Sequence, residues 1–216
     1  MTGTQRSYLP AAGRHWALPL YDPFVKLLGG DSARRALIDQ AGLSPGVRIL
    51  DVGCGTGTMV VFIKRLHPDV SVVGLDPDPE ALVRAKHKAA HLRLSIQFDR
   101  GFSDGLPYAD HSFDRVFSSL MYHHLPSDEK PKTLAEIRRV LRPGGSFHLL
   151  DLEGPDAFRH GILDHLFHRS ERLEENSQAR VLSLLQQCGF ANPQKVDHRR
   201  LLFGPVAYYR ASVPDQ

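Results

Sequence analysis

The chain has 216 residues, of which 42% are hydrophobic and 24% charged, a balance typical of a globular protein rather than a disordered or fibrous one. We expect one domain. Lys and Arg number 27 against 24 Asp and Glu, and a net charge of +3 is too small to favour nucleic acid binding. Arginine pairs at 34–35, 138–139 and 199–200 are scattered and are expected on solvated surfaces, with RNA kept as a weak alternative.

Cysteine use and hydropathy indicate the compartment. The two cysteines, Cys54 and Cys188, form no Cys-x-x-Cys pair, which fits a reducing environment. Residues 1–10 are polar and lack the apolar stretch of a signal peptide, and no apolar run approaches the roughly 18 to 20 residues of a membrane span. We therefore expect a cytoplasmic protein without a membrane span.

After an irregular, aromatic start at 8–23, short apolar runs alternate with amphipathic stretches. Strands are predicted at 47–52, 70–75, 94–98, 113–119 and 146–152, and helices at 24–28, 32–41, 58–67, 79–90 and 127–141. Ser127 is the expected N-cap of the last helix, which Pro143-Gly144-Gly145 ends. This alternation predicts an α/β fold with a parallel sheet between helices.

The pattern changes after Glu153. A histidine-rich amphipathic segment at 157–169 precedes a predicted helix at 177–188. Two strand-like runs, 194–200 and 206–211, are separated by a short turn and predict an antiparallel hairpin at the edge of the sheet.

The segment Asp51-Val52-Gly53-Cys54-Gly55-Thr56-Gly57 connects the first of these strands to a helix. Glycines at such a turn let the backbone approach a nucleotide, with N–H groups pointing at it. A dinucleotide fingerprint would require Gly at 58, where Thr58 stands. The Asp51 carboxylate would repel a pyrophosphate and attract the ammonium of a methionine moiety. The loop therefore favours an amino-acid-bearing nucleoside.

Asp76 closes the second strand about 20 residues downstream, a position from which a carboxylate can accept both hydroxyls of a ribose. Such a contact fits either kind of nucleotide. Asp76 could also be the N-cap of the helix that follows Asp76-Pro77-Asp78-Pro79, and this alternative is compatible with ligand binding.

These residues resemble the seven-stranded class I S-adenosylmethionine-dependent methyltransferases, through 49–58, 74–77, 106–119 and 141–150. The resemblance covers roughly residues 20 to 210 and is strongest to small bacterial enzymes near the quinone-biosynthesis C-methyltransferases and the phosphoethanolamine N-methyltransferases. It implies a Rossmann-like sheet, and S-adenosyl-L-methionine as cofactor with S-adenosyl-L-homocysteine as product. The expected parts of the single domain are an N-terminal helical lid (1–45), a cofactor-binding core (46–152), and an acceptor lid helix with the hairpin (153–216).

The family pattern also implies the cofactor contacts. Those to the methionine part would come from Asp51, Gly53, Cys54, Gly55 and Gly57, with Asp76 on the ribose and Pro77 against adenine. The family often has Gly-Asp after the third strand, where this chain has Gly101-Phe102. Phe102 would flank adenine or belong to the core, and Ser103 or Asp104 could take the polar contact. Ser118 and Ser119 end the fourth strand and are expected at the cleft.

Methyl transfer depends mainly on orientation and excluded water, and it needs a base only if the acceptor starts protonated. His124, after the fourth strand, is the best candidate base, since histidine titrates near neutrality. Resemblance to the phosphoethanolamine enzymes implies a catalytic pair of His124 and Tyr21. Alternatively, His124 only orients its loop and Tyr21 only packs or covers the cofactor. Asp151 and Glu153 could face the cleft, although surface carboxylates are the default interpretation.

The histidines at 160, 165 and 168 do not have the spacing of a metal site, and none is predicted. An amphipathic lid helix is favoured instead. Its apolar side would cover the acceptor pocket and comprises Phe158, Ile162, Leu166 and Phe167.

The function predicted from the sequence is methyl transfer from S-adenosylmethionine to a small-molecule acceptor by in-line displacement. An NAD(P)-dependent oxidoreductase is a second hypothesis, weakened by Thr58 and Asp51. A catalytically silent cofactor-binding partner protein is a third, disfavoured by Tyr21 and His124. RNA methylation is less favoured, and no oligomeric state is predicted.

Overall fold

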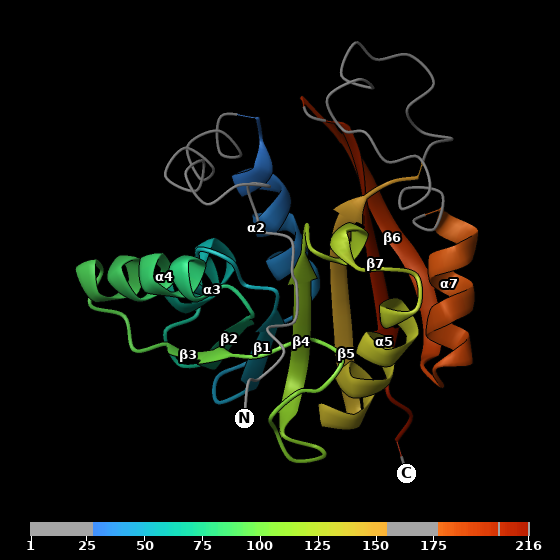
Figure 1. Ribbon diagram of the computed structural model, residues 1–216, viewed down its shortest axis with the longest axis horizontal. Coiled ribbons are helices and arrows are strands. Elements are labelled where there is room, and N and C mark those ends of the chain that lie inside the picture. The colour runs from blue at the N-terminus through green and yellow to red at the C-terminus, as the bar shows by residue number, and fades with distance from the viewer. Residues whose placement is uncertain (1–27, 155–176, 203, 216) are drawn as a thin grey trace, which may run out of the picture.

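Seven strands form one sheet with helices on both faces in the computed structural model, which describes residues 28–154, 177–202 and 204–215 (Figure 1). The strands are β1 (Arg48–Val52), β2 (Ser71–Asp76), β3 (Gln97–Arg100), β4 (Phe113–Ser119), β5 (Leu141–Leu152), β6 (Ala191–Leu201) and β7 (Gly204–Ser212). The helices are α2 (Gly30–Gln40), α3 (Thr58–Leu66), α4 (Pro79–His91), α5 (Glu129–Val140) and α7 (Gln178–Gln187), with a 3-10 turn η2 (Tyr122–His124). This arrangement confirms the predicted Rossmann-like fold.

The strand order is β3-β2-β1-β4-β5-β7-β6. The first five strands are parallel, and β7 lies antiparallel between β5 and β6. The predicted antiparallel hairpin is therefore confirmed, with β6 at the edge. From β1 the chain adds strands first on one side, β2 and β3, and then on the other side, β4 and β5. In open α/β sheets, the switch point between β1 and β4 opens a crevice at the carboxyl ends of the strands.

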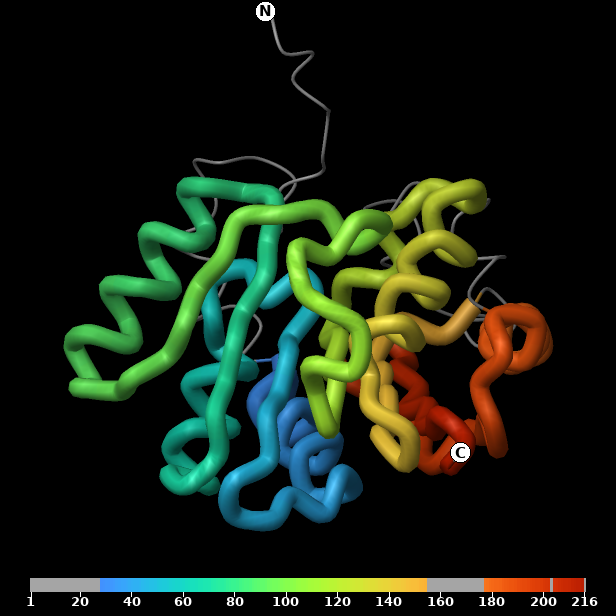
Figure 2. Tube along the Cα trace, turned by 90° about the horizontal axis from the view of Figure 1, so that it is seen from below, coloured from blue at the N-terminus to red at the C-terminus, as the bar shows by residue number. Residues whose placement is uncertain are grey.

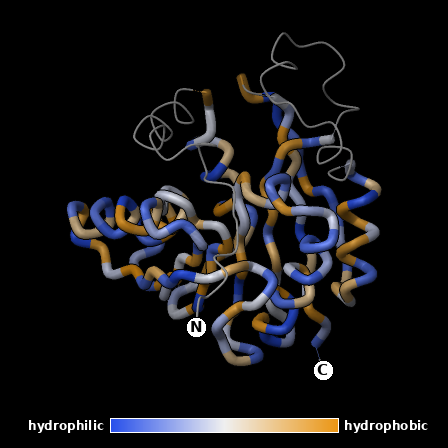
Figure 3. The backbone as a smooth tube through the Cα atoms, viewed as in Figure 1, coloured by the Kyte–Doolittle hydropathy of each residue, from blue (hydrophilic) through white to orange (hydrophobic). Residues whose placement is uncertain are grey.

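Alternate residues of each strand face opposite layers because successive side chains of a strand point to opposite sides. On β1, Ile49 packs with the layer of α2, α3 and α4, whereas Leu50 packs with the layer of α5 and α7. In Figure 2, α2 in blue and α5 in yellow lie on opposite sides of the strands. Hydrophobic segments concentrate on the central strands, and hydrophilic segments follow the outer faces of α4 and α7 (Figure 3).

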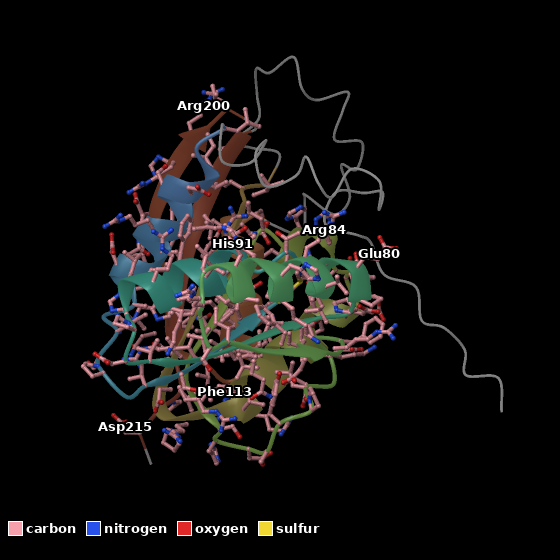
Figure 4. All side chains as sticks on the ribbon, turned by 90° about the vertical axis from the view of Figure 1, so that its left-hand side faces the viewer. Glu80, Arg84, His91, Phe113, Arg200 and Asp215 are labelled. Carbon is pink, nitrogen blue, oxygen red and sulfur yellow. The ribbon has the colours of Figure 1, made fainter. Side chains whose placement is uncertain are left out.

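The carboxyl ends of the parallel strands and the tip of the β6–β7 hairpin lie at one end of the molecule. Figure 4 shows Arg200 of this tip at the top, with Phe113 at the start of β4 and Asp215 toward the opposite end. Residues that end β1, β2, β4 and β5 are therefore neighbours at one edge.

Several predicted boundaries were wrong, among them those of β5, β3 and α5. Strand β5 begins at Leu141, which pairs with Phe113, and a bulge separates this pair from the Ser146 pair with Arg115. Strand β3 begins at Gln97 because only residues from 97 onward pair with β2. The N-cap of α5 is Asp128 rather than Ser127, and the helix starts through backbone bonds from Glu129 and Lys130 to the Pro126 carbonyl.

Several predictions lie outside the described residues. They concern Tyr21, the helix at 24–28 up to residue 27, and the histidine-rich lid at 157–169. Within the described ranges, no helix has the length and apolar character needed to cross a membrane.

Candidate functional site

A cavity of about 350 Å³ lies at the carboxyl edge of β1 and β4. The structure brings most of the predicted site residues into its lining: Asp51, Gly53, Cys54, Gly55, Asp76, Pro77, Phe102, Ser103, Ser119 and His124. Gly57, Gly101 and Ser118 adjoin lining residues in sequence but are not in the lining themselves. The predicted residues therefore converge from four loops on one cavity, at the switch point of the sheet.

Asp51 is the penultimate residue of β1, and its buried carboxylate is 1% exposed. Its Oδ1 accepts no hydrogen bond from any residue that the structure describes. Burial raises the pKa of Asp51 to about 7, with Arg34 opposing the rise and Asp76 adding to it. Because a buried carboxylate without donors is unfavourable, its place in the cavity wall suits a ligand cation.

Asp76 ends β2 and supports the glycine loop. Its Oδ2 accepts the N–H of Gly55 at 2.8 Å, and its Oδ1 accepts the N–H of Asp78 at 2.9 Å. Burial raises its pKa to about 6, against the effect of these two hydrogen bonds. Asp78, not Asp76, caps α4, by accepting the N–H groups of Glu80 and Ala81. Asp76 is therefore left to hold the loop and to face the cavity.

Gly53 and Gly57 of the loop are each required for a different structural reason. Gly53 has φ +75°, and a Cβ there would lie 2.3 Å from the Met121 Cγ. Gly57 also has a positive φ, and a Cβ there would lie 2.8 Å from the Cβ of Ala85 on α4. Gly53 therefore allows the cavity loop to approach the segment after β4, and Gly57 lets the start of α3 pack against α4.

The chemistry of the lining fits a methionine-bearing nucleoside. It offers one buried carboxylate lacking a hydrogen-bond donor, Asp51, and a second from the neighbouring strand, Asp76. The Ser103 hydroxyl, also in the lining, forms a 2.8 Å hydrogen bond with Thr133 of α5, which fixes the loop after β3. No group of three or more His, Cys, Asp or Glu residues in the described ranges could hold a metal ion.

Comparison with known proteins gives the family. Residues 49–145 match the model of the methyltransferase domain family. An uncharacterised methyltransferase of Synechocystis is 30% identical over 186 residues, which cover 83% of this chain and 84% of that protein. The chain belongs to the class I S-adenosylmethionine-dependent methyltransferases. The cofactor of this methyltransferase is S-adenosylmethionine, and the family assignment argues against the oxidoreductase hypothesis.

One further relative agrees with this family, and one solved structure shares the fold. A demethylmenaquinone methyltransferase of Deinococcus radiodurans is 36% identical over 152 residues, and the match covers 69% of this chain and 62% of that enzyme. A Haemonchus contortus phosphoethanolamine N-methyltransferase, solved with S-adenosyl-L-methionine, superposes with a TM-score of 0.73. That match covers 85% of this chain and 53% of the other at 14% identity, and so shows a shared fold.

The loop after β4 in the methyltransferase contains a histidine pair. His124 lines the cavity as predicted. The adjacent His123, which sequence reasoning did not single out, contacts the Asp151 Oδ1 through its Nδ1 at 2.5 Å. The two imidazole rings are 4.0 Å apart between centroids. His124 is thus packed against a ring that a carboxylate holds in place.

Asp151 is not the surface carboxylate expected by default. It is 1% exposed because β5 is enclosed between β4 and β7. Its other contacts are the backbone N–H groups of His123 at 2.9 Å and Leu152 at 2.7 Å. Although burial acts in the opposite direction, the His123 ring and these hydrogen bonds hold the pKa of Asp151 below its usual value. Glu153, likewise, forms an ion pair with Lys195.

We expect Asp151→Asn to lower the free energy of unfolding at pH 7 by about 1 to 3 kcal/mol. N–H groups donate to both carboxylate oxygens of Asp151. In asparagine an NH₂ group replaces one of these oxygens, and it would then face at least one N–H donor. Because the folded pKa is depressed, the parent's added stability is present above pH 3.8 and is lost as pH falls below it. Urea unfolding between pH 3 and 7 should show a flatter profile for the variant.

Asp128→Asn is the matched control for this prediction, since the Asp128 ion pair with Lys132 is exposed to solvent. Its effect should stay within about 0.5 kcal/mol. Equal effects of the two substitutions would contradict a structural role for the Asp151 contacts.

Sequence reasoning missed other lining residues. They are Arg34, Thr56, Thr58, Met59, Leu75, Leu120, Met121, Leu125, Pro126 and Glu129. The expectation that Arg34 lies on a solvated surface was wrong, because it is 5% exposed. The buried residues of α2 are 30, 33, 34, 37 and 38, which recur at helical spacing. This spacing is the sequence signal that could have predicted a buried Arg34.

Proposed function

We propose that this methyltransferase transfers a methyl group to a small-molecule acceptor bound where the cavity meets the loop after β4. The lining that carries this proposal runs from the glycine loop to η2 and the start of α5. This end of the cavity is mostly apolar: Leu120, Met121, Leu125 and Pro126, with His124 and Glu129 as its titratable groups. Such a pocket suits an organic acceptor with one polar reacting centre.

S-adenosylmethionine supplies a methyl group activated by its sulfonium. We assign Asp51 to its ammonium and Asp76 to its ribose hydroxyls, since these are the buried carboxylates of the cavity wall. The loop of Gly53, Cys54 and Gly55 would approach the methionine part through its backbone. Pro77, Phe102 and Ser103 lie in the lining at the ends of β2 and β3, where they would flank the adenine.

The apolar segment after β4 would align the acceptor and exclude water, which supplies much of the acceleration in an in-line displacement. We assign to His124 the removal of a proton from the acceptor, because it is the histidine of the lining. The contact with Asp151 would hold the His123 ring in place. His124 packs against this ring and would therefore be held in a fixed orientation toward the acceptor.

A small acceptor is favoured over RNA by the placement of the arginines. Arg34 is buried, Arg139 is paired with Glu136 and Asp110, and Arg199 is paired with Asp197. One arginine of each pair is therefore buried or neutralised by a carboxylate, which weakens the three pairs as a basic surface for RNA. The name of the Deinococcus relative, a demethylmenaquinone methyltransferase, also supports a small acceptor.

The test incubates the protein with methyl-labelled cofactor and a cell extract, and then separates small molecules from protein and nucleic acid. We expect label in one or a few small molecules. Label that enters only RNA or protein would contradict the small-acceptor proposal. If no label leaves the cofactor although the protein binds it, the silent partner hypothesis replaces catalysis.

His124→Ala is expected to lower turnover by about 100-fold or more, the scale of general acid–base catalysis, while leaving cofactor affinity within about twofold. Labelled-methyl transfer and calorimetry on the same preparation measure the two quantities. His87→Ala, on the exposed face of α4, is the matched control. Unchanged turnover in His124→Ala would remove this residue from the chemistry.

A further inference from the structure

The loop between β3 and β4, residues 101–112, contains neither a helix nor a strand, yet it supplies Phe102 and Ser103 to the cavity lining. Its backbone polar groups therefore lack the partners that a regular element would give them. Side chains of α5 bond to several of these groups instead.

Glu136 and Arg139 of α5 hold the part of this loop that lies beyond the cavity. The Glu136 Oε2 accepts the N–H of Leu106 at 2.7 Å. Arg139 donates to the carbonyls of Leu106 at 3.0 Å and Tyr108 at 2.8 Å. Two further hydrogen bonds, of 2.7 and 2.8 Å, join Arg139 to Glu136. The bond from Arg139 lowers the pKa of Glu136, which is therefore a carboxylate at neutral pH.

Thr133 of α5 holds the cavity end of the same loop. It lies one turn before Glu136 on the same face of the helix and is 0% exposed. Its Oγ1 and the Ser103 Oγ are 2.8 Å apart and share a hydrogen bond. Thr133, Glu136 and Arg139 are not themselves in the cavity lining. Any effect of these three residues on a ligand must therefore pass through the loop.

We propose that Glu136 and Arg139 position the loop for the adenine of the cofactor, so that Phe102 and Ser103 are already in place when the base arrives. The two side chains fix the loop during folding, and cofactor binding then does not bear the entropic cost of ordering it. They are positioning residues, since they touch neither cofactor nor acceptor. The inference rests on the proposed function, which places the adenine beside Phe102 and Ser103.

Calorimetric titration with S-adenosylhomocysteine and with S-ribosylhomocysteine tests the proposal. The second ligand keeps the amino-acid part and the ribose but has a hydroxyl in place of the adenine. We expect the parent protein to bind the adenosyl ligand at least about tenfold more tightly, the scale of stacking between a base and an aromatic ring. Equal affinity of the parent for both ligands would overturn the inference, since the adenine would then gain nothing from the loop.

Arg139→Lys keeps the positive charge, but an ammonium cannot reproduce the planar set of donors that meets Glu136 and two carbonyls. This variant should bind S-adenosylhomocysteine about 5- to 20-fold more weakly, a part of the stacking contribution, and S-ribosylhomocysteine within about twofold of the parent. Arg138→Lys is the matched control and should change neither affinity. The Arg138 guanidinium donates to the Gly189 carbonyl, which lies outside the loop.

Thr133→Val tests the other anchor of the loop, and it decides the matter if Arg139→Lys does not fold. It should weaken binding of S-adenosylhomocysteine by about two- to tenfold, the scale of one neutral hydrogen bond, and leave S-ribosylhomocysteine unaffected. An equal loss for both ligands, or no loss for the adenosyl ligand, would overturn the inference, because an effect on the fold alone does not depend on adenine. A parent protein that binds neither ligand would instead contradict the proposed function.

Discussion

Asp51→Asn is expected to weaken binding of S-adenosylmethionine by about 10- to 100-fold, because the neutral amide loses a charge-assisted hydrogen bond to the ammonium. The same substitution should raise the free energy of unfolding at pH 8 by up to about 4 kcal/mol. The carboxylate is buried without donors from the described chain, and its pKa rises from 3.8 to about 7, where each unit corresponds to about 1.4 kcal/mol. The Asp51 carboxylate is therefore expected to favour cofactor binding and to lower the stability of the fold.

The pH dependence of this stabilisation follows from the direction of the shift. Between pH 3.8 and about 7 the folded protein retains a proton at Asp51 that the unfolded chain has lost, so its stability falls as pH rises through this window. Urea unfolding at pH 5 and pH 8 should therefore show the larger gain for Asp51→Asn at pH 8. Asp39→Asn, exposed on α2, is the control. Destabilisation by Asp51→Asn at both pH values, or unchanged cofactor affinity, would contradict the prediction.

Gly53→Ala is expected to lower the free energy of unfolding by about 2 to 5 kcal/mol. The left-handed backbone at φ +75° disfavours alanine by about 1 to 2 kcal/mol. The new Cβ would also lie 2.3 Å from Cγ and 2.8 Å from Cβ of Met121, and such overpacking costs about 1 to 3 kcal/mol more. Moving Met121 should distort the cavity and weaken cofactor binding as well.

Gly46→Ala separates these two effects. Gly46 has φ +81°, but a Cβ there would meet nothing within 4 Å. It should therefore show only the backbone effect, about 1 to 2 kcal/mol in urea unfolding. Equal destabilisation by the two alanines would show that the approach of Met121 to Gly53 contributes nothing.

Local sequence patterns predicted which residues line the cavity at the ends of β1 and β2. The Asp51-to-Gly57 turn is contiguous in the chain, so its placement between β1 and α3 followed from an apolar run, three glycines and an amphipathic stretch. Asp76 was predicted by its spacing after the loop. Its hydrogen bond to the Gly55 N–H was not, because it joins residues 21 apart across two strands.

The features that the sequence did not predict depend on contacts between residues that lie far apart in the chain. His123 and Asp151 are 28 residues apart and meet because β4 and β5 are neighbours with their carboxyl ends at the same edge. The scattering of the arginine pairs along the sequence favoured a solvated Arg34, yet the helical period of α2 places it on the buried face. Strand β5 begins at Leu141 because this residue pairs with Phe113 of β4. The strand therefore includes the Pro143–Gly145 segment, which was predicted to lie between the helix and the strand.

Calorimetric titration of the parent protein with S-adenosylhomocysteine at pH 8 and pH 6 tests most directly whether Asp51 forms the cofactor site. Saturable binding is predicted at pH 8. Because only the carboxylate form attracts the ammonium, and the pKa of Asp51 is about 7, affinity should be about tenfold weaker at pH 6. Asp51→Asn should remove most of this pH dependence. Absence of binding at pH 8, or an affinity that does not change with pH in the parent, would contradict the assignment of Asp51.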